Sequence, residues 1–252
     1  MKISSIKKLK NNMYEVTLEN EDKLELYEDI ILKYDILLSK RINEDILDEI
    51  LNDNKVIEAY YLAIKYLKTK MRTKYEIREK LKTFEINDNI IERVIERLQE
   101  QRYVDDKYYV EIYINDCLKL NLYGPNKIKK ILIEKGVDMD IISEFLDKIN
   151  DKVWIKRIEK LIEKRKKSNK DGLYVFKNKT INFLLNNGYS LELSNNCIKD
   201  IRLDTDYEFK KTAQNEWSKL SKKYKGNTLI FKFKNSMYSK GFTIEQINDY
   251  LN

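Results

Sequence analysis

The sequence predicts a mainly α-helical protein. Tandem three-helix repeats, similar to helix-turn-helix units, are expected to form a curved array behind a small N-terminal β-meander with two further helices. Three observations lead to this prediction. A block of about fifty residues recurs four times, one proline and six glycines interrupt the 252 residues, and strand-like alternation is confined to residues 3–27. A period of this length is typical of small helical units that bury a core only by stacking.

Four columns of equivalent residues mark the repeat, with separations of 51, 52 and 53 residues in each column. A large apolar residue comes first, an apolar or aromatic residue follows five positions later, and a helix-capping residue comes directly after that. These three columns are Leu81, Leu132, Leu184 and Met237; Ile86, Val137, Tyr189 and Phe242; and Asn87, Asp138, Ser190 and Thr243. In the fourth column, between the two apolar ones, three repeats have Gly136, Gly188 and Gly241, and the first has Glu85.

The N-terminal segment predicts a small antiparallel meander, because apolar and polar side chains alternate over residues 3–27. A polar Asn20–Asp22 turn separates two of its strands. The apolar members are Tyr14, Val16, Leu18, Leu24 and Leu26. Two helices are expected to follow, at roughly Asp29–Leu37 and Asn43–Leu51.

A short polar stretch at Asn52–Asn54 is expected to separate the extension from the repeats. The predicted domains are an N-terminal β-containing extension over residues 1–54 and tandem three-helix repeats over residues 55–252. The repeats are expected to span approximately 55–104, 105–152, 153–203 and 204–252.

The first two repeats show the clearest helix boundaries. In the first, Thr73 and Glu76 form a predicted capping box that opens a second helix ending near Phe84, and Asn87 opens the third. In the second repeat three positions define the helices: Asp105 caps the first, Gly124-Pro125 opens the second and Asp138 starts the third. Gly136 is expected to end the second helix in a left-handed conformation.

The third and fourth repeats follow the same register. A long basic helix is expected from Lys152 to about Lys170, and helices are expected near Asn178–Leu185 and Asn227–Tyr238. Residues Leu229–Phe233 resemble a strand in composition, but their register favours a helix. Thr243–Gln246 predicts a capping box for the last helix.

The residues present argue against an enzyme. The chain has no histidine, which removes the usual general base and histidine metal ligands, and it has no glycine-rich phosphate loop. The adjacent Asp105 and Asp106 fit a helix cap and first-turn acid better than a Mg²⁺ site. No catalytic residue, metal site or cofactor is therefore expected. Cys117 and Cys197 are expected to be reduced, and the absence of a long apolar run or signal peptide predicts a cytoplasmic protein without membrane contact.

Charge is unevenly distributed. The net charge is +7, yet residues 1–58 hold 9 basic against 14 acidic residues, which leaves 40 basic against 28 acidic residues in the remainder. This imbalance favours a polyanionic partner or an acidic protein surface for the repeats. The predicted contact residues lie around the second helices of the first two repeats: Arg72, Lys74, Arg78, Lys82, Lys127, Lys129 and Lys130. The third repeat adds Lys156, Arg157, Lys160, Lys164, Arg165, Lys166 and Lys167. Solvated helix faces remain an alternative for any single lysine.

Several segments together resemble the RecX family over about residues 55–252. They are Arg72–Leu81, Tyr103-Val104-Asp105-Asp106 with Tyr109, Gly124-Pro125 with Lys127-Ile128, Lys135-Gly136-Val137, and Lys240–Thr243 with Ile247. The N-terminal meander resembles the extension of the longer members. Two positions depart from the family pattern, because Glu85 replaces a glycine and Val110 stands where alanine is common.

The resemblance implies a regulator that binds the filament of the RecA recombinase, commonly suppressing its ATP hydrolysis and strand exchange in recombination and repair. It implies docking along the filament groove, contact with single-stranded or duplex DNA weakly or through RecA, no cofactor, and a monomer. One alternative is a helical array that binds DNA independently of RecA. Another is a scaffold whose lysines only promote solubility.

Overall fold

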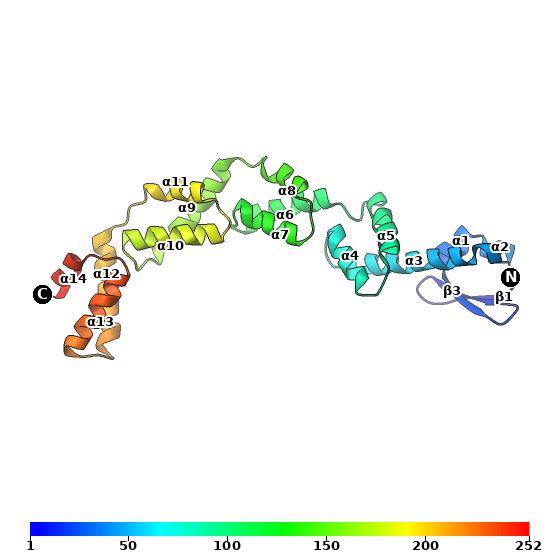
Figure 1. Ribbon diagram of the computed structural model, residues 1–252, viewed down its shortest axis with the longest axis horizontal. Coiled ribbons are helices and arrows are strands. Elements are labelled where there is room, and N and C mark those ends of the chain that lie inside the picture. The colour runs from blue at the N-terminus through cyan, green and yellow to red at the C-terminus, as the bar shows by residue number, and fades with distance from the viewer. Residues whose placement is uncertain (252) are drawn as a thin grey trace. The chain divides into compact units, whose positions relative to one another are not determined.

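The computed structural model describes residues 1–251, except for the side chain of Thr205. Within that part it contains fourteen α-helices and one three-stranded sheet (Figure 1), so the predicted mainly helical fold with a small β-containing head is confirmed. The chain forms two compact units. Unit 1 comprises Met1–Glu111 and Ile133–Ile141, and unit 2 comprises Ile112–Leu132 and the chain from Ile142 onward. No helix of the described residues is long and apolar enough to cross a bilayer.

The N-terminal sheet is the predicted meander. Strands β1 (Ile3–Lys8), β2 (Met13–Leu18) and β3 (Lys23–Tyr27) pair antiparallel in sequence order, with Val16 opposite Ile6 and Leu24. Alternation buries one face of the sheet against the helices that follow. The buried members of this core are Val16, Leu18, Leu26, Ile30, Ile31, Ile36, Ile42, Ile50 and Ile57.

The first predicted helix after the sheet is broken in two. Helix α1 covers Glu28–Lys33 and α2 covers Ile36–Ser39, because Asp35 between them adopts a left-handed conformation with φ 48°. A short 3-10 turn, Glu44–Ile46, then leads into the next helix.

No loop lies at the predicted boundary near residue 54. Helix α3 runs from Leu47 to Leu67 and joins the expected Asn43–Leu51 helix to the first helix of the repeats. No glycine or proline interrupts this segment, so nothing in the chain forces a turn there. The polar Asn52–Asn54 stretch is helical, and its Asp53 is buried by partners from both sides of the boundary. The division into an extension and four repeats stays a prediction about folding units.

Most of the remaining helix starts agree with the capping residues in the sequence, but the helix expected near Asn178–Leu185 begins earlier, at Leu173. Helices α4 (Lys74–Lys82) and α5 (Asp88–Glu100) begin after Thr73 and Asn87, and the Thr73–Glu76 capping box forms. The later helices are α6 (Asp106–Leu120), α7 (Pro125–Glu134), α8 (Met139–Leu146), α9 (Asp151–Lys167), α10 (Leu173–Asn186), α11 (Leu191–Lys199), α12 (Thr205–Ser221), α13 (Gly226–Ser239) and α14 (Ile244–Leu251). Residues Leu229–Phe233 lie inside α13, which confirms the helical interpretation.

The glycine column has a common backbone conformation. Gly136, Gly188 and Gly241 have φ of 71°, 86° and 84°, and Glu85 has φ 59° at the same position. The turn in the first repeat is therefore formed without glycine. Only the glycines lie against a second helix of another repeat: a Cβ on Gly188 would stand 2.2 Å from the Lys127 nitrogen.

Hydrogen bonds join these helix ends in the same way at three places. The backbone N–H of Gly124 donates to Asn187 O, and that of Gly172 donates to Lys240 O, both at 2.7 Å. At the third place the Thr73 hydroxyl donates to Lys135 O at 2.7 Å. Each bond links the start of the second helix of one repeat to a carbonyl at the end of the second helix of another repeat, in the residue just before the glycine. Carbonyls that would be unpaired at a helix end therefore receive donors. These bonds fix the orientation of the candidate basic helices α4 and α7.

Candidate functional site

Arg72 is held by its own neighbours. Its guanidinium lies 4.0 Å from the ring centre of Tyr66 and 3.6 Å from Glu76, and only 14% of its side chain is exposed. Lys135 also binds Glu76, at 3.0 Å. Burial would raise the pKa of Glu76, but Lys135, the Thr73 N–H and Arg72 together hold that pKa below its ordinary value. Arg72 therefore stabilises the start of α4 rather than presenting a free charge.

Arg78 and Lys82 also have internal partners. Arg78 forms a bidentate pair with Glu92, with nitrogen–oxygen distances of 2.7 to 2.9 Å. Lys82 lies 3.8 Å from Glu79 and 3.6 Å from Asp88. The Lys82 pairs are exposed and weak, but the bidentate arginine pair has the stronger geometry. Among the predicted contacts on α4, these two offer less net positive charge than the sequence suggested.

Lys74 is a half-buried residue at the first position of α4. Its backbone N–H donates to the Asp106 carboxylate at 3.0 Å. Burial raises the pKa of Asp106 against the opposing effect of that hydrogen bond. Asp105 accepts from the N–H groups of Lys107 and Tyr108. Asp106 therefore stabilises the start of α4 and Asp105 the start of α6, as the cap interpretation predicted. Within residues 1–251 no group of histidine, cysteine or carboxylate side chains has the arrangement of a metal site.

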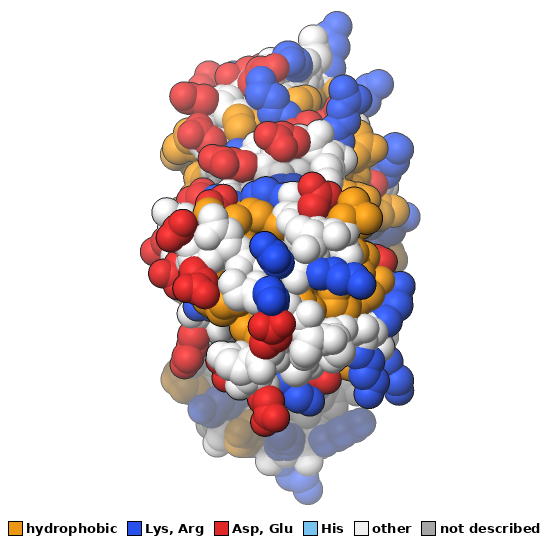
Figure 2. All heavy atoms as spheres, turned by 90° about the vertical axis from the view of Figure 1, so that its right-hand side faces the viewer, with side chains coloured by type: hydrophobic (Ala, Val, Ile, Leu, Met, Phe, Trp, Pro, Cys, Tyr) orange, Lys and Arg blue, Asp and Glu red, His pale blue; other side chains and the backbone are white. Residues whose placement is uncertain are grey.

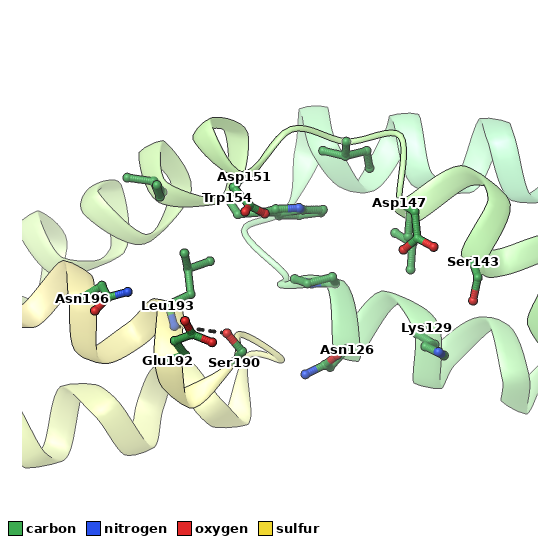
Figure 3. A pocket seen from close by; sticks show the side chains of 14 residues that line it. Asn126, Lys129, Ser143, Asp147, Asp151, Trp154, Ser190, Glu192, Leu193 and Asn196 are labelled. Carbon is green, nitrogen blue, oxygen red and sulfur yellow. Dashed lines mark hydrogen bonds between the residues drawn. The ribbon is translucent and has the colours of Figure 1, made fainter.

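The three predicted residues on α7 differ in their surroundings. Lys127 is half-buried, with its ammonium 4.0 Å from the ring centre of Tyr123. Lys129 lines a cavity of unit 2 (Figure 3), and Lys130 is exposed. The predicted contacts thus fall into two groups, Arg72 to Lys82 in unit 1 and Lys127 to Lys130 in unit 2.

The third repeat holds a row of lysines of which the sequence prediction named all but Lys152, without separating them from the other basic residues nearby. Five exposed lysines follow α9 at steps of four, four, four and three residues, and none has a hydrogen-bonding or ionic partner among the described residues. They are Lys152, Lys156, Lys160, Lys164 and Lys167. Such steps place side chains on one helix face, spaced by about 6 Å along the axis. The i, i+4 spacing was the available signal, but buried and paired basic residues nearby obscured it.

Three basic residues of this repeat do not belong to the row. Arg157 is only 6% exposed and donates to the carbonyls of Leu118 and Cys117 at 2.7 and 3.0 Å, at the end of α6. Arg165 donates to the Thr180 hydroxyl, and Lys166 pairs with Glu163. The inclusion of Arg157 in a basic surface was wrong, because its side chain points into unit 2 and binds carbonyls left unpaired at a helix C-terminus.

The head presents a different surface. Figure 2, in which the end with the N-terminal sheet faces the viewer, shows acidic side chains mainly toward the left, basic side chains mainly toward the right and both in the middle. Several of these lysines have carboxylate partners, among them Lys8 with Glu28 and Lys23 with Glu15. The unpaired lysine row on α9 has no counterpart of that length in the described part of the head.

Comparison with known proteins supports the fold and the family. Residues 59–98 match the family model "RecX, first three-helix domain". A regulatory protein RecX from Bacillus cereus is 35% identical over 227 residues, covering 88% of this chain and 84% of the relative. One from Bacillus cytotoxicus is 32% identical with the same coverage.

Two solved structures have the same fold. A crystal structure of regulatory protein RecX aligns with a TM-score of 0.70 and 24% identity, covering 79% of this chain and 99% of that one. A crystal structure of RecX from Lactobacillus salivarius aligns with a TM-score of 0.54 and 28% identity, covering 57% of this chain and 95% of that one. Identity above 30% across most of both chains, together with the repeat columns and capped helices, shows that this chain belongs to the RecX family of regulatory proteins.

Proposed function

We propose that this protein binds RecA filaments on DNA and restrains their ATP hydrolysis and strand exchange. The relatives are named regulatory protein RecX, and that name supports a regulatory role directed at RecA. We further propose that the protein acts in the cytoplasm as a monomer, without a cofactor and without catalysing a reaction itself.

The observation that carries the proposal is the unpaired lysine row on α9, with Lys129 and Lys130 on α7 as further cationic side chains. A filament of recombinase on DNA offers both phosphates and acidic protein surface, and a regularly spaced row of ammonium groups suits either. Of the contacts predicted from sequence, Lys74, Lys127 and Lys129 keep this role as proposals, and so does Lys130, which also interacts with another group of the chain. Arg72, Arg78 and Lys82 keep it with a smaller expected contribution, because carboxylates already bind them.

The first experiment measures ATP hydrolysis by RecA on single-stranded DNA while this protein is added well below the RecA concentration. Suppression at such ratios is expected, because one bound regulator affects many protomers of a filament. Simple competition for DNA could not act at that ratio. Unchanged hydrolysis at equimolar protein would contradict the proposal.

A second candidate function is DNA binding without RecA. The lysine row favours it, since unpaired ammonium groups on one face of α9 can neutralise phosphates. It predicts tight binding to bare DNA whose affinity falls steeply with salt. Binding that is weak at physiological salt, together with suppression of RecA, would exclude it as the main activity.

A further inference from the structure

A cavity of about 650 Å³ lies within unit 2 and differs in charge from the rest of the repeats. It is formed by the start of α7, the α8–α9 connection and the starts of α9 and α11 (Figure 3). Its lining includes three carboxylates, one ammonium group and one indole: Asp147, Asp151, Glu192, Lys129 and Trp154. The repeats carry a large excess of positive charge, so a cavity with three carboxylates and one lysine is unexpected.

The three carboxylates are exposed and have no ion pair or hydrogen-bond donor from side chains within residues 1–251. Helix dipoles account for two of them, because Asp151 and Glu192 lie in the first turns of α9 and α11. They do not account for Asp147. It follows the last residue of α8, where the helix end is negative and a carboxylate is disfavoured.

Trp154 gives independent evidence for a ligand. Its side chain is 3% exposed, yet its indole N–H has no acceptor in the described part of the chain. The indole lies beside Asp151 and borders the cavity (Figure 3). The indole nitrogen is not among the fully buried atoms that lack a partner, so its N–H is accessible from the cavity. A ligand in the cavity could therefore supply an acceptor to the Trp154 N–H and cations to the carboxylates.

We propose that this cavity binds a basic peptide segment of a protein partner. An arginine or lysine side chain of the segment lies among Asp147, Asp151 and Glu192, and a backbone carbonyl of the segment accepts from Trp154. Arginine suits the site best, because its planar guanidinium can bind two carboxylates at once. Lys129, on the same side of the cavity as Asp147 in Figure 3, disfavours a further positive charge at that end and gives the segment a direction. This site is separate from the lysine surface of the proposed function and opposite in charge.

The test uses the fluorescence of Trp154. The chain has two tryptophans, and Trp217→Phe leaves Trp154 as the only one. The probe is the peptide acetyl-Gly-Arg-Arg-Gly-amide. We expect a saturable change in Trp154 emission at millimolar peptide. In the variant Asp147→Asn/Asp151→Asn/Glu192→Gln, binding should weaken about tenfold or more, from the loss of partly exposed charge pairs.

Two controls make the result specific. The matched variant Asp206→Asn/Glu245→Gln/Asp249→Asn changes three exposed carboxylates of unit 2 outside the cavity lining and should bind like the parent. The peptide acetyl-Gly-Glu-Glu-Gly-amide should not bind. In the unsubstituted chain, added salt should weaken binding of the basic peptide, which tests the proposal even if a variant fails to fold. Absence of a saturable change, equal binding by both triple variants, or tighter binding of the acidic peptide would overturn it.

Discussion

Arg157 shows at the scale of one residue why a sequence can place a charge wrongly. In the sequence it stands among lysines and looks like part of a basic surface. In the fold it is buried, its guanidinium donates to Leu118 O and Cys117 O, and its Nε has no partner in the described residues. The burial depends on where the end of α6 lies, which local sequence does not specify.

We expect Arg157→Met to destabilise unit 2 by about 3 kcal/mol, because carbonyls at the end of α6 lose their donors in a site that excludes water. Arg157→Lys should cost less but should not restore stability, since one ammonium cannot reach several carbonyls in the geometry of a guanidinium. Urea unfolding followed by circular dichroism measures both. As a control, Lys156→Met on the exposed face of α9 should change stability by less than about 0.5 kcal/mol.

Asp53, at the junction of the head and the repeats, makes the stability of the fold depend on pH. Burial would raise its pKa, but hydrogen bonds from Lys33, Arg93 and Tyr34 outweigh burial and lower the pKa to about 2. Because the folded pKa is below the ordinary value of 3.8, the group stabilises the fold above pH 3.8 and loses this effect as pH falls through about 2.

Asp53→Asn should therefore lower stability near neutral pH by roughly 2 kcal/mol, which is the free-energy equivalent of the pKa shift. The difference from the parent protein should shrink as the pH falls below 3.8. Urea midpoints between pH 7 and pH 2 measure this difference. A constant difference across that range would show that the ion pairs with Lys33 and Arg93 are not its source.

At the scale of elements, two structural requirements act on the turn that follows the second helix of each repeat, where the glycine column lies. One is a left-handed backbone, which Glu85 meets with φ 59°. The other is close approach to another second helix, which only the glycines meet, since a Cβ on Gly188 would stand 2.2 Å from the Lys127 nitrogen. The first repeat tolerates a side chain because Glu85 is exposed.

Substitutions at two positions of the glycine column should change the stability of the protein in opposite directions. Glu85→Gly should stabilise the protein by about 1 kcal/mol, because glycine adopts the left-handed conformation without the cost of a Cβ. Gly188→Ala should destabilise it by at least about 2 kcal/mol, from backbone strain plus displacement of α7. Thermal unfolding of the two variants measures both changes in stability. A similar small effect at both positions would mean that packing against Lys127 is not required.

Local signals predicted the helices well, and tertiary contacts explain what they missed. Thr73 and Asn87 cap their helices through their own side chains, so sequence alone located the starts of α4 and α5. The expected break near Asn54 is absent because Asp53 binds Lys33 on one side and Arg93 on the other. The candidate site was predicted less well, since the partner of Arg78, Glu92, lies on a different helix.

At the scale of the whole molecule, the question is which of its many cations are available to a partner. Internal carboxylates engage Arg72, Arg78 and Lys82, whereas the row on α9 has no partner among the described residues. An interaction with phosphates or acidic protein gains most from cations that do not have to leave an existing ion pair.

The variant Lys156→Gln/Lys160→Gln/Lys164→Gln should therefore weaken suppression of RecA ATP hydrolysis about tenfold or more, as a shift in the concentration needed for half-maximal effect. It removes three unpaired charges from one helix face without breaking an ion pair of the described structure. The matched control is Lys7→Gln/Lys10→Gln/Lys55→Gln, which removes three exposed charges from the head and α3 and should leave suppression near that of the parent. Equal losses would indicate that net charge alone governs binding. A third variant, Arg72→Gln/Arg78→Gln/Lys82→Gln, tests the residues around α4. If suppression is lost only in this variant, the contact lies at α4 and filament binding replaces the internal ion pairs with intermolecular ones.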